Sequence, residues 1–189
     1  MRVSLHREPS GAADIARHYI RDLIYGANDG IITTFAVVAG VTGGALSPKA
    51  VLIVGIANLL ADGLSMGVGN YLSIRSHESA RAAQGLAEEE AAPAKHGTVT
   101  FAAFALAGAL PLLPYGFGAE PDLGLLLSVL LTLVGLFVIG SSRSLVTVDR
   151  WWVAGLEMLL LGAVVAGAAY GSGALVAWLL ADPAVSAAR

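Results

Sequence analysis

The sequence predicts an all-α membrane protein that crosses the bilayer five times, and three observations support this. Of the 189 residues, 56% are hydrophobic and only 13% are charged, whereas soluble domains carry about 25% charged residues. The mean hydropathy is +0.73. The apolar residues also gather into five stretches, each close to the ~20 residues that a transmembrane helix needs. We therefore expect membrane lipid to surround most of the chain.

The expected spans divide the chain into a membrane domain and two terminal segments. We place the spans at about 23–45, 50–73, 98–117, 123–142 and 152–180, inside a transmembrane domain of residues 23–182. Turn-forming sequences that contain Pro48, Pro93 and Pro121 separate them. Residues 1–22 precede the first span, and residues 10–21 are either an interfacial helix or a polar extension of that span. Residues 75–97 are a short loop and residues 183–189 a C-terminal tail.

The distribution of basic residues predicts the orientation. Nine of the 11 Lys and Arg residues fall before the first span, between the second and third, or between the fourth and fifth. Only Lys49 and Arg189 fall on the opposite side. Because basic residues are enriched in cytosolic loops, we expect the N-terminus in the cytosol and the C-terminus outside.

Composition excludes several classes of function. The chain has no cysteine, so a metal ion must be held by oxygen, imidazole or thioether ligands. A net charge of −3 and the lack of a basic run argue against nucleic acid as a partner. There is no nucleophile–base set and no glycine-rich phosphate loop, so we expect neither an enzyme nor a bound cofactor. All four histidines are expected in cytosolic segments rather than in a pocket: His6, His18, His77 and His96.

Two acidic residues follow one face of the first span. Asp22 and Asp29 are seven residues apart, which is two helical turns, so they project in the same direction. At 1.5 Å per residue, Asp29 lies about 10 Å deeper than Asp22. Placing a charged carboxylate in hydrocarbon costs several kcal/mol, so two carboxylates along one face of a membrane helix indicate a path for cations.

A polar stripe also follows the second span. Its members fall within about a third of the helix circumference: Asn58, Asp62, Ser65, Met66, Gly69 and Ser73. Hydrogen bonding between helices is an alternative reason for such a stripe. However, Met66 is one turn from Asp62, where its thioether would be a soft ligand beside hard carboxylates. Such mixed ligands suit Fe²⁺ better than Mg²⁺ or Ca²⁺.

Two long stretches resemble the signature sequences of a known family. DLIYGANDGIITTF at residues 22–35 and ADGLSMGVGNYL at residues 61–72 resemble those of the vacuolar iron transporter family. A weaker glycine-rich pattern at 155–171 is similar to the family's last helix. The resemblance covers essentially the whole membrane region.

The resemblance implies both a fold and an activity. It implies a homodimer of five-helix protomers, with an ion path between the first two helices of each. It also implies proton-coupled export of Fe²⁺ from the cytosol, into a vacuole in a eukaryote or across the plasma (inner) membrane in a bacterium. In the family, the residues that match Asp29 and Met66 handle the metal, and the acid that matches Asp22 lies nearer the entrance. To these we add Asp62, with Asn28, Asn58 and Ser65 as supporting polar residues.

The chain departs from the family pattern in two places. Plant-type members insert a metal-gathering cytosolic domain between spans two and three, whereas the short loop here resembles the nodulin-like branch. Metal gathering by its polar residues, as opposed to a solvated face, is the weaker hypothesis for Glu78, Glu88, Glu89 and Glu90, with His77 and His96. Asn58 also stands where some members have a carboxylate. Glu157 in the last span either takes part in transport or pairs with Arg143 or Arg150.

Two other functions stay open. The same ligands would accept Mn²⁺ with a different affinity, which makes a Mn²⁺ transporter the nearest alternative. The other is a non-transporting membrane scaffold, in which Asp29 and Asp62 only pair with other side chains. In that case, replacement of Asp29 would impair folding or dimerisation rather than flux.

Overall fold

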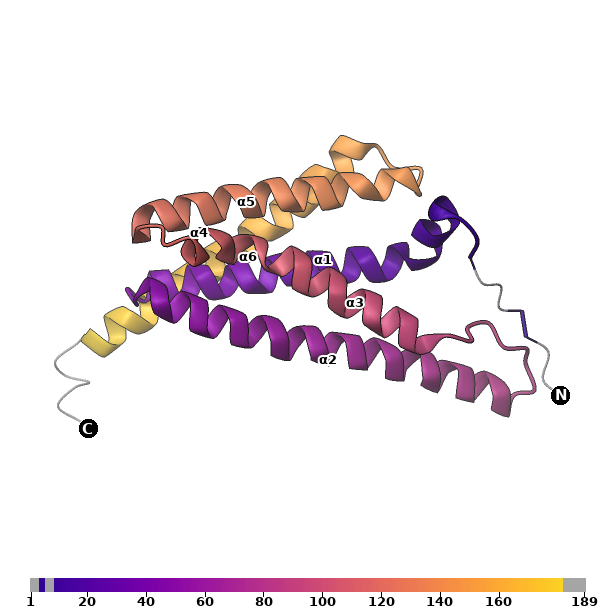
Figure 1. The fold of residues 1–189 in the computed structure, drawn as a ribbon. Helices are drawn as coiled ribbons and strands as arrows, with labels where there is room; N and C mark the ends of the chain where they lie inside the picture. Colours follow the sequence, from indigo (N-terminus) through magenta and orange to yellow (C-terminus); the bar gives the residue numbers. More distant parts are fainter. Residues whose placement is uncertain (1–3, 6–8, 182–189) are drawn as a thin grey trace.

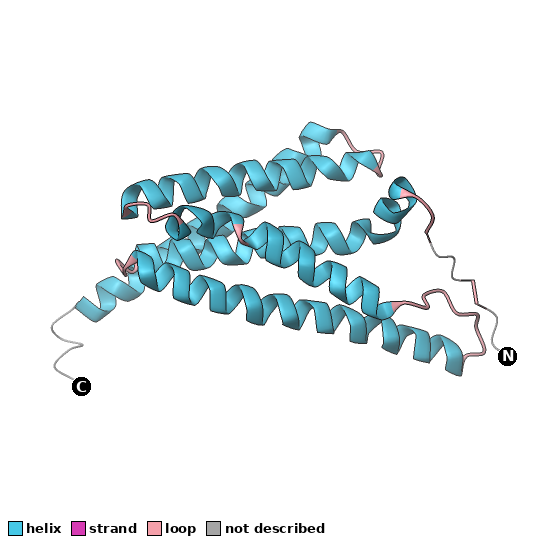
Figure 2. Ribbon diagram, in the orientation of Figure 1, coloured by secondary structure: helices cyan, strands magenta, loops and turns pink. Residues whose placement is uncertain are grey.

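The fold is known from a computed structural model that describes residues 4–5 and 9–181. The predicted tail at 183–189 lies outside the described residues, as does part of the N-terminal segment. Within the described part, the chain is a bundle of helices joined by short loops (Figure 2). Five helical segments are long and apolar enough to cross a membrane, which confirms the predicted number.

The helical elements follow the predicted order. In sequence they are α1 (Ala12–Gly43), α2 (Pro48–Ala83), α3 (Pro93–Gly108), the 3₁₀ turn η1 (Leu110–Leu112), α4 (Leu113–Gly116), α5 (Pro121–Ser142), the 3₁₀ turn η2 (Arg143–Leu145) and α6 (Trp151–Ala181). Proline stands at the first position of α2, α3 and α5, where its missing N–H costs no hydrogen bond. The Ser47 hydroxyl also accepts a hydrogen bond from the Ala50 N–H at the start of α2.

The first two helices extend beyond the hydrocarbon length at the same end of the bundle. Because α1 already begins at Ala12, residues 10–21 belong largely to a polar extension of the first span and not to a separate helix. Likewise, α2 continues past the predicted end at residue 73 to Ala83. Gly85, with φ +71°, then turns the chain back toward α3.

The third span is interrupted, whereas the sequence analysis treated it as one continuous helix. Helix α3 ends at Gly108, and η1 and α4 complete the crossing. Pro111 and Pro114 explain the break, because each removes a backbone donor and its ring clashes with the preceding turn. The Ser128 hydroxyl of α5 donates a 2.7 Å hydrogen bond to the Pro111 carbonyl, so this carbonyl is satisfied inside the bundle.

Helix α1 lies at the centre of the bundle and contacts α2, α3, α5 and α6 (Figure 1). The start of α1, the α2–α3 loop and the α5–α6 turn all lie at one end, here called the N-terminal end. The α1–α2 turn and the end of α6 lie at the other. The described basic residues other than Lys49 therefore gather at the N-terminal end, as the alternation of spans requires; its assignment to the cytosol stays a prediction.

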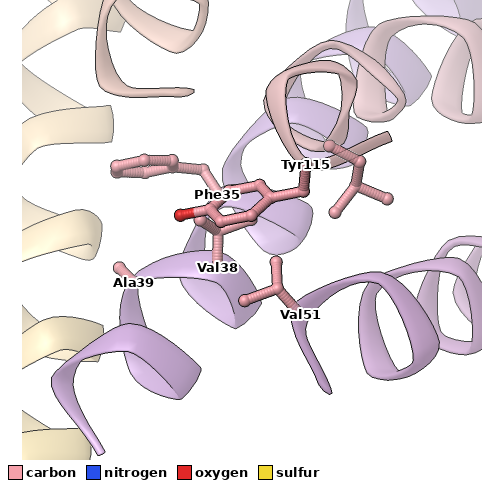
Figure 3. Close-up of a cluster of buried hydrophobic side chains, with 6 residues drawn as sticks. Phe35, Val38, Ala39, Val51 and Tyr115 are labelled. Carbon is pink, nitrogen blue, oxygen red and sulfur yellow. The ribbon is translucent and has the colours of Figure 1, made fainter. Parts of the chain in front are cut away.

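Apolar packing holds the end opposite to the N-terminal end. Phe35, Val38 and Ala39 of α1 meet Val51 of α2 and Tyr115 of α4 (Figure 3). These side chains are all at least nine-tenths buried. The apolar cluster fixes the far ends of α1 and α2 against each other, which leaves the polar residues in the other part of the bundle.

The glycines of the two signature stretches have a different partner from the expected one. In the sequence, Gly26 and Gly30 are four residues apart, as are Gly63 and Gly67, and this spacing predicts a close approach of α1 to α2 at these glycines; this prediction is wrong. Both pairs pack against α3 instead. A Cβ atom on Gly30 would lie 2.3 Å from the Phe104 carbonyl oxygen, so the backbones of α1 and α3 are in direct contact.

Candidate functional site

Two acidic side chains, one on α1 and one on α2, lie close enough for their charges to interact. Asp29 of α1 and Asp62 of α2 are both half-buried, and their charges interact. Each side chain comes from a segment long and apolar enough to lie in the membrane. Two like charges in such a place repel each other, so their juxtaposition favours a bound cation or a shared proton.

Polar groups extend this site along both helices. Asn58 and Met66 are half-buried and lie one turn before and one turn after Asp62, so they share its face of α2. Asn28 precedes Asp29 on α1 but lines a separate cavity of about 430 Å³ with Arg143 and Glu157. Among the described residues, Asn28 Oδ1 and Asn58 Nδ2 are buried without a hydrogen-bond partner. Buried polar atoms are normally paired, which makes these two atoms candidates for contact with a passing ion or its water.

The same stripe on α2 continues to the outside of the single chain. Ser65, Gly69 and Ser73 are exposed, and a Cβ atom on Gly69 would meet nothing within 4 Å. Ser65, predicted as a supporting residue, therefore points away from the described interior. A polar strip that faces outward at membrane depth calls for a second protein surface rather than lipid.

Asp22 lies at the N-terminal end of this path, in a network that joins three helices. Its side chain is only 2% exposed. The Asn70 amide of α2 donates a 2.8 Å hydrogen bond to Asp22 Oδ1 and lies equally close to the Thr100 hydroxyl of α3. Asp22 Oδ2 lies 2.5 Å from His96 Nδ1 at the start of α3. Asp22 is thus held rigidly, with both oxygens in use.

Three histidines line a cavity in this part of the site, contrary to the expectation that all four would lie outside a pocket; His6 lies outside the described residues. Glu90 Oε2 lies 2.9 Å from His96 Nε2 and 3.4 Å from His18 Nε2. His18, His77 and His96 all line a cavity of about 550 Å³, together with Asp22 and Glu90. The sequence did contain a signal for His18, because it stands four residues before Asp22, on the same face of α1.

The other acidic residues of the α2–α3 loop have structural partners. Glu78 Oε1 accepts hydrogen bonds from the backbone N–H groups of Glu89 and Glu90. The Glu89 carboxylate pairs with Arg81 at 2.8 Å. Glu88 meets the N-terminal segment through its backbone carbonyl, which accepts a hydrogen bond from the Leu5 N–H. Of these acids, only Glu90 lies against the two histidines.

Glu157 lies on the exposed surface of α6. It pairs with Arg143 of η2 at 3.1 Å, and 58% of its side chain is exposed. This is the ion pair that the sequence analysis offered as the alternative to a transport role. No contact of Glu157 with Asp22, Asp29 or Asp62 is found among the described residues.

The chain is similar in sequence to known proteins over most of its length. The sequence model of the VIT family matches residues 20–91 and 78–174, which together cover most of the chain. The chain is 26% identical to the vacuolar iron transporter of Toxoplasma gondii over 245 aligned residues, covering 92% of this chain and 81% of that protein. It is 27% identical to vacuolar iron transporter 1 of Eucalyptus grandis, covering 82% of this chain and 86% of that protein.

A shorter match with a higher percentage identity lies within one part of the chain. It is 46% identical to the vacuolar iron transporter of Plasmodium falciparum over 54 residues, or 29% of this chain and 20% of that protein. The family match spans both signature stretches, including Asp29 and Met66. From the extent of the match, this chain belongs to the VIT family.

Proposed function

We propose that this protein exports Fe²⁺ from the cytosol in exchange for protons, along a path at the interface of a homodimer. The observation that carries the proposal is the placement of two half-buried acids, Asp29 and Asp62, on neighbouring membrane-length helices, near enough for their charges to interact. The names of the relatives, all vacuolar iron transporters, supply the substrate. The matching membrane is the vacuolar membrane in a eukaryote and the plasma membrane in a bacterium.

The ligands along α1 and α2 fit a borderline divalent ion. Fe²⁺ would enter near Asp22 and pass to Asp29 and Asp62, with the Met66 thioether as a soft ligand. Asn58 supplies an amide group on the same face of α2 as Asp62. Mn²⁺ is the second candidate substrate, because the carboxylate and amide ligands would accept it, whereas a thioether favours Fe²⁺.

Exchange for protons follows from the charges. When the metal ion leaves, two adjacent carboxylates in a medium of low polarity cannot both stay charged without cost, so a proton takes its place. The next metal ion displaces that proton. Each cycle therefore moves metal and proton in opposite directions.

We expect Fe²⁺ uptake into proteoliposomes to depend on a pH gradient. With the N-terminal end of the protein facing outward, an acidic lumen supplies the exchanging protons, so initial uptake should be several-fold faster than at equal pH. An alkaline lumen should slow it. The measurement is Fe²⁺ entry, followed with an encapsulated fluorescent chelator, with protein-free vesicles as the control.

Uptake that is indifferent to the gradient would rule out proton exchange while leaving metal transport in place. No uptake under any gradient would overturn the proposed function. A competing excess of Mn²⁺ in the same assay ranks the two ions. If Mn²⁺ inhibits Fe²⁺ entry at a lower concentration than Fe²⁺ itself requires, Mn²⁺ is the preferred substrate.

The homodimer is supported by the outward-facing part of the polar stripe. Ser65, Gly69 and Ser73 would meet lipid in a single protomer. Within the hydrocarbon layer, a helical protein can enclose a polar path only with helices. The side of the path that this protomer leaves open must therefore be covered by the surface of another helix. A second copy of α2, with α1 beside it, would place two sets of Asp29, Asp62 and Met66 around one seam.

The absence of native cysteines allows a direct test of this interface. We expect Ser65→Cys protomers in membranes to form a disulfide-linked dimer with a mild oxidant, detected on a non-reducing gel. Val134→Cys is the matched control, because Val134 is exposed on α5, away from α2. Equal cross-linking of both variants, or none of Ser65→Cys, would contradict an interface along α2.

A further inference from the structure

Three side chains at the N-terminal end of the bundle form a group that could hold a metal ion. His18 of α1, Glu90 of the α2–α3 loop and His96 of α3 each offer one ligand atom, and these three atoms lie within 4.8 Å of one another. The Glu90 oxygen lies between the two Nε2 atoms, at 2.9 Å from His96 and 3.4 Å from His18. When ligand atoms bind one metal ion at about 2.0–2.2 Å each, neighbouring ligand atoms lie about as far apart as the Glu90 oxygen and the two histidine nitrogens do here.

The buried acid Asp22 orients the His96 ring for this purpose. Its carboxylate lies 2.5 Å from His96 Nδ1, so it would accept the Nδ1 proton whenever Nε2 binds a metal ion. The coordinating atom would then be Nε2, which faces Glu90, and the metal ion would replace any proton between Nε2 and the Glu90 carboxylate. A carboxylate that fixes the far nitrogen of a histidine is the usual support for a metal ligand in proteins. Asn70 holds the other oxygen of Asp22 in turn.

Hydrogen bonds from two side chains of α2, and one within the loop, hold Glu90 in this position. The Glu78 carboxylate accepts the N–H groups of Glu89 and Glu90, and Arg81 donates twice to the Ala87 carbonyl. The Glu90 carboxylate also accepts the Ala92 N–H through Oε1, which leaves Oε2 directed at the histidines. The loop is therefore folded around Glu90 rather than simply solvated.

The ligand set and its surroundings select a class of ion. Two imidazoles and one carboxylate suit Fe²⁺ and similar transition metals, whereas Mg²⁺ and Ca²⁺ prefer oxygen ligands alone. The cavity of about 550 Å³ beside the three residues gives room for water or an exchanging ion in the remaining positions. Asp22 connects the group to Asp29, about 10 Å further along α1.

We propose that His18, Glu90 and His96 bind a divalent transition-metal ion at the cytosolic mouth, upstream of the Asp29 and Asp62 pair. The inference rests on the proposed function, since it names the site that receives the ion before it enters the membrane. In this chain, the α2–α3 loop thus supplies one receiving ligand, and α1 and α3 supply the other two.

Co²⁺ binding to the full-length protein tests the site without transport. Co²⁺ is titrated into detergent-purified, chelator-stripped protein and followed by visible absorption and equilibrium dialysis. We expect His18→Gln and Glu90→Gln each to weaken the highest-affinity binding by about 10-fold or more. Glu88→Gln, with the same change of charge two residues away, should bind as wild type. Both His18 and Glu90 are partly exposed, so the variants should fold, which size-exclusion chromatography checks.

A second measurement separates this site from the membrane site. Asp29→Ala should retain the high-affinity Co²⁺ binding although its flux is lost. In proteoliposomes, Glu90→Gln should need about 10-fold more Fe²⁺ for half-maximal uptake but reach the wild-type maximum. Unchanged Co²⁺ binding in His18→Gln and Glu90→Gln, or an equal loss in Glu88→Gln, would overturn the mouth site while wild-type flux still supported the transporter. Absence of wild-type flux would instead overturn the proposed function.

Discussion

Replacement of Asp29 with alanine is expected to reduce Fe²⁺ flux by about 100-fold or more while the protein still folds and dimerises. A unit charge about 4 Å from another contributes roughly 4 kcal/mol at an effective dielectric constant of about 20. Loss of that attraction at the membrane site would lower the affinity for the metal ion by a factor well above 100. The measurement is initial Fe²⁺ uptake into proteoliposomes that contain equal amounts of wild-type and variant protein.

Asp122→Asn provides the control for this experiment. Asp122 is exposed in the first turn of α5, at the end of the bundle opposite to His18 and His96, so its loss should leave the flux unchanged. Met66→Leu, which retains most of the side-chain volume, should have a smaller effect than Asp29→Ala and should alter the preference between Fe²⁺ and Mn²⁺. Aggregated or monomeric Asp29→Ala protein would support the scaffold alternative and contradict the transporter.

Gly30→Ala is expected to destabilise the bundle by about 3 kcal/mol, the upper end of the range for overpacking. The new Cβ atom would lie 2.3 Å from the Phe104 carbonyl oxygen and 2.9 Å from the Phe104 Cα atom. Both are backbone atoms of α3, so no side-chain rotation relieves the overlap and the two helices must separate. The measurement is thermal unfolding of the detergent-solubilised protein, followed by loss of the monodisperse fraction.

Gly171→Ala is the matched control, because Gly171 is also inside a helix but a Cβ atom there meets nothing within 4 Å among the described residues. Its replacement should leave stability unchanged or raise it by about 1 kcal/mol, since alanine favours a helix more than glycine. A Gly30→Ala protein as stable as Gly171→Ala would show that α1 and α3 do not pack backbone to backbone.

The number of membrane-length helices could be predicted from the sequence because it follows from local composition. Hydropathy over about 20 residues depends on no distant contact, and the prolines at 48, 93 and 121 mark helix starts directly. The choice of packing partner is different. Glycine spacing shows that a helix has a smooth face, but not which neighbour covers it, so the assignment of Gly26 and Gly30 to α2 was wrong.

The candidate site could be predicted in part for the same reason. The sequence placed Asp22 and Asp29 on one face of α1, and the structure brings Asp62 within electrostatic reach of Asp29. His18 and His96 are separated by most of two membrane crossings in the chain, so their meeting depends on how α1 and α3 pack. The glycine contacts set how far α1 is shifted along α3, and this position brings both histidine rings to Glu90.

The short segment between α2 and α3 has a consequence for how this bundle varies in length among its relatives. Helix α2 ends at Ala83 and α3 begins at Pro93, outside the apolar core, and the two matched segments overlap at residues 78–91. The alignment with the Toxoplasma gondii protein extends over 245 residues, more than this chain contains. Closing a longer excursion costs only about 0.6 kcal/mol per doubling of its length. A longer connection at this junction would therefore leave the packing of the five membrane-length helices almost unchanged.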